Sequence, residues 1–173
     1  MLTIDLKQMI RSVPDFPKPG INFFDITTLL KEPEGLKATI DSLVAPYDRT
    51  GIDVVVGVES RGFILGAAVA ERIGAGFIPV RKPGKLPAKV IKEIYELEYG
   101  KDALEIHADA IEKGERVLIV DDVLATGGTA AATTRLVKQL GGDLQGLAFL
   151  IELTFLSGKS KLPGENVFSV LQY

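Results

Sequence analysis

VLIVDDVLATGGT, residues 117–129, joins an apolar run to two acids and a loop of small residues. The run from Arg116 to Asp121 predicts a strand that is buried on both faces. Apolar spacing after the loop predicts a helix over about 129–140, which Gly141 and Gly142 end. A buried strand, a short loop and a helix are the repeating unit of a parallel α/β sheet.

The same alternation of strand and helix extends over most of the chain. DVVVGV (53–58) is a second β-branched run of the kind that forms a buried strand. Apolar patterns predict a helix over 61–73 and strands over 76–80, 146–153 and 167–171. Crossover helices between strands make the sheet parallel. We therefore expect one α/β domain over residues 1–173, with a mostly parallel central sheet flanked by helices.

Two segments do not follow this alternation. Helical spacing over 5–12 and about 34–46 brackets PDFPKPGINFFDITTL (14–29), whose three prolines favour an irregular arm. RKPGKLPAKVIK (81–92) carries five basic residues and no acid. We expect a polar flap over about 81–103, with weak strands around 90–97 and 104–107.

Composition excludes several classes of function. The chain has 173 residues and a net charge of −3, which gives no overall attraction to nucleic acid or to an anionic membrane. The absence of cysteine excludes disulfides and thiolate chemistry, and a single histidine, His107, excludes a multi-histidine zinc site. Neither a signal peptide nor an apolar run of membrane-spanning length is visible. We expect a cytoplasmic protein with no nucleic-acid or membrane partner.

The loop after the strand can bind a phosphate. In an open parallel sheet, ligands bind at the carboxyl ends of the strands. The small residues of the loop expose backbone N–H groups at a helix N-terminus, and two threonines add hydroxyls. The acid pair would repel a phosphate, so it suits the hydroxyls of an attached sugar. A tight turn that merely needs glycines is the alternative; a Walker loop is excluded because no lysine follows the glycines.

Two further groups of residues point to anion binding. GVESRG (57–62) follows the first buried strand, and the planar fork of Arg61 suits a pyrophosphate. Arg81, Lys82 and Lys85 lie together in the flap, where they could close over a phosphorylated ligand. From residue types alone, Arg61 could equally be a solvated residue at a helix start, and the basic run a solvated face.

VLIVDDVLATGGT resembles the motif by which type I phosphoribosyltransferases bind 5-phosphoribosyl 1-pyrophosphate (PRPP). Four further stretches are similar to the adenine-specific branch of that family: PDFPKPGINFFDIT (14–27), GVESRGF (57–63), RKPGKLP (81–87) and LEYGKDALEIH (97–107). The resemblance covers nearly the whole chain. It implies the type I phosphoribosyltransferase fold, with an N-terminal hood over about residues 1–30 and a flexible basic flap.

The resemblance also implies roles for individual residues. The PRPP 5-phosphate is held by Ala125, Thr126, Gly127, Gly128 and Thr129, and the ribose hydroxyls by Asp121 and Asp122. The pyrophosphate is received by Glu59, Ser60 and Arg61, with a cis peptide between the first two, and is covered by Arg81, Lys82 and Lys85. Glu98 approaches the imidazole edge of adenine and assists proton transfer at N7.

In the hood, the family pattern places main-chain bonds to adenine at Asn22 and Phe24 and a stacked ring at Phe23. Many adenine-specific members have a basic residue at the position of Phe24, so a contact from that side chain to the phosphates is lost here. Phe16 is expected to fill a core instead.

The implied reaction is adenine plus PRPP to AMP plus pyrophosphate, a step of purine salvage. Mg²⁺ is expected to be held mainly by substrate oxygens and water, with no metal site on the protein. The implied assembly is a homodimer. Transfer to another purine and a regulatory protein that senses PRPP are the alternatives, and the hood residues favour adenine transfer.

Overall fold

The computed structural model describes residues 4–96 and 100–173. The chain forms two compact units, Met1–Ser42 and Leu43–Tyr173. Within the described ranges, every helix is too short or too polar to cross a membrane.

The first unit contains a small antiparallel pair of strands. Its elements are the 3-10 helix η1 (Leu6–Met9), β1 (Arg11–Val13), β2 (Phe23–Asp25), α1 (Thr27–Lys31) and α2 (Pro33–Val44), the last of which crosses the unit boundary. The helix predicted over 5–12 is wrong. Its second half is β1, because Arg11 pairs with Asp25 of β2 in the strand register and their side chains form an ion pair of 2.8 Å. The predicted irregular arm is correct only in part: residues 14–22 form the loop of a hairpin, whereas β2 and the start of α1 are regular.

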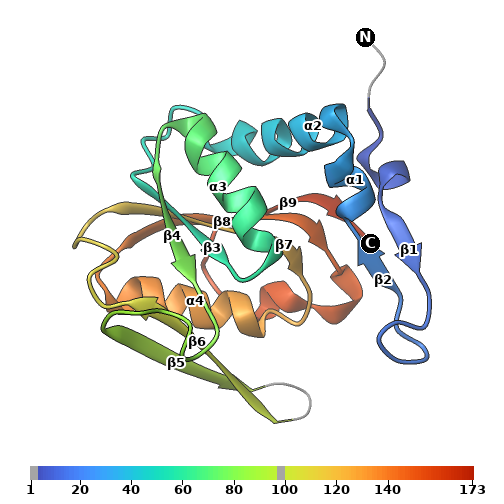
Figure 1. Ribbon diagram of the computed structural model, residues 1–173. Coiled ribbons are helices and arrows are strands. Elements are labelled where there is room, and N and C mark those ends of the chain that lie inside the picture. The colour runs from blue at the N-terminus through green and yellow to red at the C-terminus, as the bar shows by residue number, and fades with distance from the viewer. Residues whose placement is uncertain (1–3, 97–99) are drawn as a thin grey trace. The chain divides into compact units, whose positions relative to one another are not determined.

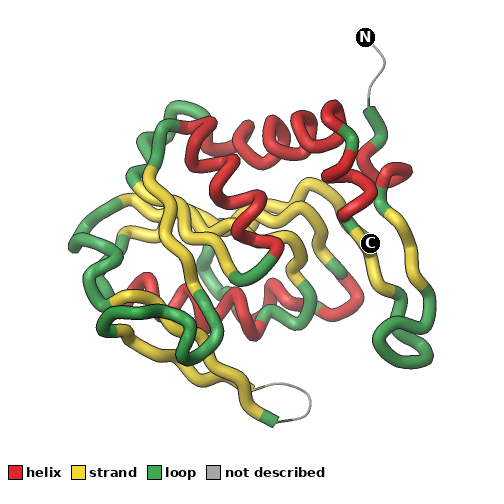
Figure 2. The backbone as a smooth tube through the Cα atoms, in the orientation of Figure 1, coloured by secondary structure: helices red, strands yellow, loops and turns green. Residues whose placement is uncertain are grey.

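The second unit is built on a five-stranded sheet with the order β4-β3-β7-β8-β9, in which every neighbouring pair is parallel (Figures 1 and 2). This confirms the predicted fold class. The strands are β3 (Val54–Val58), β4 (Gly76–Val80), β7 (Arg116–Leu124), β8 (Asp143–Glu152) and β9 (Val167–Gln172). The helical elements are η2 (Ala45–Tyr47), α3 (Arg61–Ile73), α4 (Gly128–Gln139), η3 (Thr154–Leu156) and η4 (Gly158–Lys161).

Alternate residues of the strands face opposite layers of the unit. Val56 and Ile119 pack into the main core with α4, and α3 covers the other face of the sheet (Figure 1). On that face α3 crosses β3 at two glycines. A Cβ on Gly66 would lie 3.3 Å from the α-carbon of Gly57, and a Cβ on Gly57 would lie 2.6 Å from the ring of Phe77. This close approach brings the start of α3 to the carboxyl ends of β3 and β7.

The predicted flap contains a regular hairpin. β5 (Val90–Glu96) pairs antiparallel with β6 (Lys101–His107), and the hairpin packs on α4. The weak strand predicted over 104–107 starts earlier, at Lys101, and is not weak: Leu104 and Ile106 are fully buried in the main core. The loop before this hairpin, over about residues 83–89, is mostly exposed.

Candidate active site

β7 carries the acid pair and leads into the small-residue loop. The strand does not end at Asp121 as predicted but continues to Leu124, which pairs with Glu152 of β8. The loop is therefore a tight bend. Gly127 has a left-handed φ of 80°, and α4 starts at Gly128 with no side chain bonded across its first N–H groups. Such a helix start favours an anion through its exposed N–H groups and its dipole.

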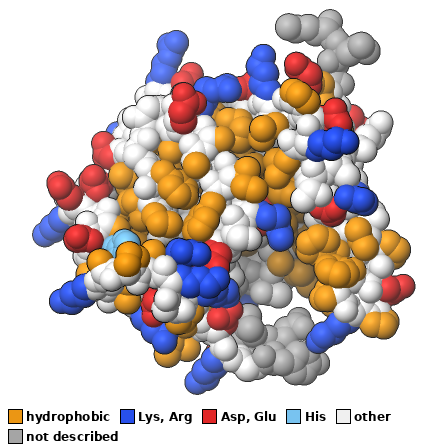
Figure 3. All heavy atoms as spheres, viewed as in Figure 1, with side chains coloured by type: hydrophobic (Ala, Val, Ile, Leu, Met, Phe, Trp, Pro, Cys, Tyr) orange, Lys and Arg blue, Asp and Glu red, His pale blue; other side chains and the backbone are white. Residues whose placement is uncertain are grey.

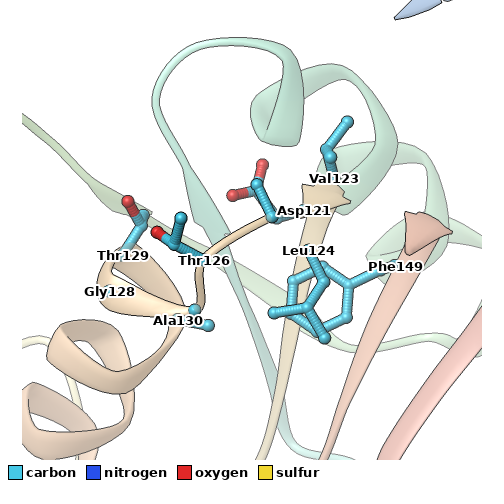
Figure 4. A pocket seen from close by; sticks show the side chains of 10 residues that line it. Asp121, Val123, Leu124, Thr126, Gly128, Thr129, Ala130 and Phe149 are labelled. Carbon is cyan, nitrogen blue, oxygen red and sulfur yellow. The ribbon is translucent and has the colours of Figure 1, made fainter. Parts of the chain in front are cut away.

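A hollow of about 90 Å³ lies at this bend. It is smaller than the roughly 300–1,000 Å³ of a site for a whole drug-sized ligand, so its size suits one phosphate group. Figure 4 shows Thr126 and Thr129 on the helix side of the hollow and Asp121 on its strand side. Its lining residues are Asp121, Val123, Leu124, Ala125, Thr126, Gly127, Gly128, Thr129, Ala130 and Phe149.

The two acids of β7 have different partners. Asp122 is buried, and its Oδ2 forms an ion pair with Nε of Arg61, the first residue of α3. Asp121 is partly buried, and its Oδ1 accepts a hydrogen bond of 2.9 Å from the N–H of Asp122. Burial and the neighbouring Asp122 carboxylate raise the pKa of Asp121 well above its ordinary value. Asp121 thus holds its proton to a higher pH than an aspartate in water does.

Replacing Asp121 with asparagine is expected to stabilise the ligand-free protein at neutral pH. Because the pKa of Asp121 is raised on folding, its contribution to stability is complete below about pH 4 and is lost as the pH rises toward the folded-state value. Asparagine does not ionise, so its contribution to stability does not fall as the pH rises. Calorimetry should show a higher Tm for Asp121→Asn at pH 7, by about 2–4 °C per kcal/mol recovered, and a smaller difference near pH 4.

Asp109→Asn is a matched control at an exposed position, and it should change Tm at neither pH. Equal Tm values for Asp121→Asn and the parent protein at pH 7 would contradict the raised pKa of Asp121.

The turn after β3 is the second part of the site. The peptide between Glu59 and Ser60 is cis, as the resemblance implies, and α3 begins at Arg61. The carboxylate of Glu59 accepts a hydrogen bond of 3.3 Å from Nε of Arg81 and one of 3.0 Å from the backbone N–H of Lys82, and it pairs with Lys85. Although burial acts in the opposite direction, the bonds from Lys85 and Lys82 lower the pKa of Glu59. The turn and the base of the flap are thus held together.

A hydrogen-bonded network joins the flap to the bend. The ammonium of Lys82 pairs with Asp102 and lies 3.3 Å from the hydroxyl of Tyr95, which donates to Asp102 at 3.1 Å. The hydroxyl of Thr129 donates to the same Tyr95 oxygen at 3.3 Å. Asp102 and Tyr95 were not predicted as site residues. The local sequence shows an ordinary strand pattern at both, and only the β5–β6 pairing brings them together.

Two aromatic residues of the hood, Phe16 and Phe23, lie at a small apolar cavity in the first unit. Phe23 packs edge-on against Phe16 with 5.3 Å between the ring centroids, and both line a space of about 170 Å³. The prediction that Phe16 fills a core is wrong, because half of its surface is exposed. Asn22 accepts a hydrogen bond of 2.7 Å from Ser12, and Phe24 pairs with Ser12 in the strand register.

The structure thus brings together most of the predicted residues of the second unit. The bend, the acid pair and Arg61 meet at the carboxyl ends of β3 and β7, and the base of the flap is bonded to the turn beside them. Glu98, the predicted proton-transfer residue, lies outside the described residues.

Known proteins share this sequence and this fold over nearly the whole chain. Residues 26–164 match the family described as phosphoribosyl transferase domain. The adenine phosphoribosyltransferase of Koribacter versatilis is 60% identical over 168 residues, 97% of this chain and 92% of that protein.

Two crystal structures of adenine phosphoribosyltransferases agree with this match. The enzyme of Rhodothermus marinus is 58% identical, with a TM-score of 0.93 over 97% of this chain and 96% of the other. That of Saccharomyces cerevisiae, solved with an imino-altritol bisphosphate and adenine, is 45% identical, with a TM-score of 0.91 over 96% of each chain. With matches of this extent, the chain belongs to the adenine phosphoribosyltransferase family of pentosyltransferase enzymes.

Proposed function

We propose that this enzyme joins adenine to the ribose 5-phosphate of PRPP at the carboxyl end of β7, releasing pyrophosphate and forming AMP. The observation that carries this proposal is the phosphate-sized hollow between Asp121 of the acid pair and the start of α4. The bend from Ala125 to Thr129 binds the 5-phosphate through main-chain N–H groups and threonine hydroxyls. With the 5-phosphate bound at the bend, the ribose hydroxyls of the same molecule lie next to Asp121 and Asp122.

The pyrophosphate of PRPP binds at the turn Glu59–Ser60–Arg61, under the flap cations. Arg61 starts α3 and is paired with Asp122, so one guanidinium borders both the sugar and the pyrophosphate regions. Arg81 and Lys85 reach the turn through Glu59, and Lys82 is held beside it by Asp102. When PRPP arrives, these cations exchange carboxylate partners for phosphate oxygens.

The chemical step is a displacement at the anomeric carbon. Pyrophosphate leaves, positive charge grows on the ribose ring in an oxocarbenium-like transition state, and N9 of adenine forms the new bond. No protein nucleophile is needed, so catalysis rests on positioning and on charge stabilisation by the acid pair. Glu98 is the proposed partner for the proton at N7.

The donor groups of the site suit a magnesium ion that is bound mainly by the substrate. Asp122 is engaged by Arg61, and the raised pKa of Asp121 makes it a weak anionic ligand. In the described parts of the chain no three acidic or imidazole side chains gather as a metal site. Mg²⁺ bound with PRPP would supply positive charge that offsets the charge of the leaving pyrophosphate. We propose that substrate oxygens and water would hold it, and that Asp121 and Asp122 would interact with its water ligands.

Adenine is recognised by the hood. The S. cerevisiae relative was solved with adenine, which supports a purine-base site in this chain as well. Phe23 offers an aromatic face beside an apolar cavity, which suits stacking on a flat base. The proposed main-chain bonds come from Asn22 and Phe24. Since the phenyl ring of Phe24 carries no charge, its side chain offers no contact to the phosphates.

A competition between purine bases tests the proposal. The enzyme is incubated with labelled PRPP, Mg²⁺ and equal concentrations of adenine, hypoxanthine and guanine, and the nucleotides are separated. AMP should be nearly the only product, since a site that hydrogen-bonds one base edge rejects analogues strongly. IMP or GMP as the main product would show that adenine is not the preferred base. Tight PRPP binding with no nucleotide formed would favour a sensor of PRPP.

We also propose that the enzyme is a homodimer, joined through the surface of α3 and β4, and acts in the cytoplasm. Figure 3 shows hydrophobic side chains gathered over these elements. Ile64 and Phe77 are exposed there, and Phe63 packs edge-on against Phe77 with 5.9 Å between the ring centroids. Exposed apolar patches of this kind mark protein interfaces. The patch adjoins Arg61, as expected for family dimers.

Placing a charge on this patch is expected to separate the subunits. Ile64→Lys buries an ammonium in the proposed interface, which costs several kcal/mol without a partner. Light scattering coupled to size-exclusion chromatography should show monomers for Ile64→Lys. Ile94→Lys, a change of the same type at an exposed position of β5, should leave a dimer. A dimer for both variants would place the interface elsewhere.

A further inference from the structure

The bend that follows β7 rests directly on the backbone of a distant residue, Gly158. A Cβ on Gly127 would lie 2.3 Å from the carbonyl oxygen of Gly158, and a Cβ on Gly158 would lie 2.3 Å from the carbonyl oxygen of Ala125. Both distances are far below van der Waals contact, so neither position has room for a side chain. Two backbone segments, 31 residues apart at Gly127 and Gly158, therefore fix each other's position.

The segment around Gly158 is itself tied to the sheet. The next residue, Lys159, forms an ion pair of 2.9 Å with Glu152 at the end of β8, whose side chain is 7% exposed. Ser169 of β9 donates a hydrogen bond of 2.8 Å to the same Glu152 oxygen. At the other end of the segment, the N–H of Thr154 donates to the carbonyl of Tyr173 at 2.9 Å. Gly158 is thus held by contacts to β8 and to the chain after β9.

We propose that Gly158 is a positioning residue for PRPP, and that the Lys159–Glu152 pair keeps it in place. The inference rests on the proposed role of the bend as the 5-phosphate site. A phosphate bound by main-chain N–H groups is sensitive to where those groups lie, and Gly158 supports the carbonyl of Ala125 and the N–H of Gly127 from behind. Gly158 does not touch the substrate itself. It sets the geometry of the groups that do.

The substitution Gly158→Ala isolates this contact. Gly158 does not have a positive φ, so alanine adds no backbone strain there, and its Cβ can act only by pushing the bend. A displacement of about 1 Å can cost about 100-fold, so we expect KM for PRPP to rise roughly 10- to 100-fold with KM for adenine nearly unchanged. Gly76→Ala is the matched control: its Cβ would be 3.4 Å from Val54, an ordinary contact, and it should leave both constants unchanged.

Calorimetric binding of two partial ligands separates positioning from general damage. Ribose 5-phosphate carries only the 5-phosphate, whereas inorganic pyrophosphate tests the turn at Glu59–Arg61. Gly158→Ala should weaken the binding of ribose 5-phosphate by roughly 10-fold or more and leave the Kd of pyrophosphate within twofold of the parent value. Equal weakening of both ligands, or no change in either, would overturn the inference.

The ion pair gives a second, independent variant. Lys159→Met leaves Glu152 without its cation and should raise KM for PRPP in the same selective way, and Lys159→Arg should restore it. If Gly158→Ala and Lys159→Met both keep the parent KM for PRPP, the positioning role is wrong. If Gly127→Ala also keeps it, the bend is not the 5-phosphate site, and the proposed function loses its phosphate site as well.

Discussion

Asp122→Asn is expected to lower kcat/KM for PRPP by about 10²–10³-fold, the usual loss when one preorganised electrostatic group of an active site is removed. Asp122 is 7% exposed and is paired with Arg61, so the substitution has two effects. It removes a charge beside the developing oxocarbenium, and it leaves Arg61 without this carboxylate. Steady-state kinetics with varied PRPP at saturating adenine measure the loss.

The amide of asparagine occupies nearly the same volume as the carboxylate, so the sheet should remain intact. Circular dichroism should be unchanged, and Glu71→Gln, a charge removal on the exposed part of α3, should keep full activity. A kcat/KM for Asp122→Asn within tenfold of the parent value would mean that Asp122 does not act on the substrate.

Gly127→Ala is expected to lower kcat/KM by more than about 100-fold, whereas the same change one residue later is mild. At Gly127 the φ of 80° is unfavourable for alanine by about 1–2 kcal/mol, and the Cβ would also meet the carbonyl of Gly158 at 2.3 Å. At Gly128 the backbone is helical, and the nearest atom to a Cβ is in the ring of Tyr95 at 3.2 Å. This contact requires a shift of only a few tenths of an ångström, far less than the overlap with a backbone oxygen at Gly127.

The pair is compared by kcat/KM and by Tm under identical conditions. We expect a loss of more than about 100-fold for Gly127→Ala and less than about tenfold for Gly128→Ala, because only the first displaces main-chain N–H groups of the bend. Similar activities of the two variants would show that the shape of the bend does not control phosphate binding.

The sequence predicts the strands, the helix and the bend whose formation depends on neighbouring residues in the chain. The β-branched run at 54–58 and the apolar run before Asp121 are buried parallel strands, as expected, and α3 has the predicted bounds, Arg61–Ile73. The small-residue bend between β7 and α4 was also visible, since strand, glycines and helix are contiguous in the chain. Each of these features is determined by neighbouring residues.

The remaining features depend on contacts between distant residues. The helical spacing over 5–12 is overridden by the pairing of β1 with β2, because the ion pair of Arg11 with Asp25 and the strand register outweigh a weak local preference. Gly158 gives no local signal in the sequence. It matters because its backbone lies against the carbonyl of Ala125, which is distant in the chain. Glu152 looks like the end of an ordinary strand until Lys159 folds back onto it.

The flap appeared in the sequence as a run of unopposed positive charge, and the structure shows how that charge is balanced. Its cations Arg81, Lys82 and Lys85 pair with two carboxylates from outside the run, Glu59 and Asp102. A third carboxylate, that of Glu105, accepts a hydrogen bond of 3.0 Å from the backbone N–H of Gly84. An anion that binds these cations would have to break their pairs with Glu59 and Asp102. The free energy of breaking those pairs therefore counts against the affinity of every anionic ligand of the flap.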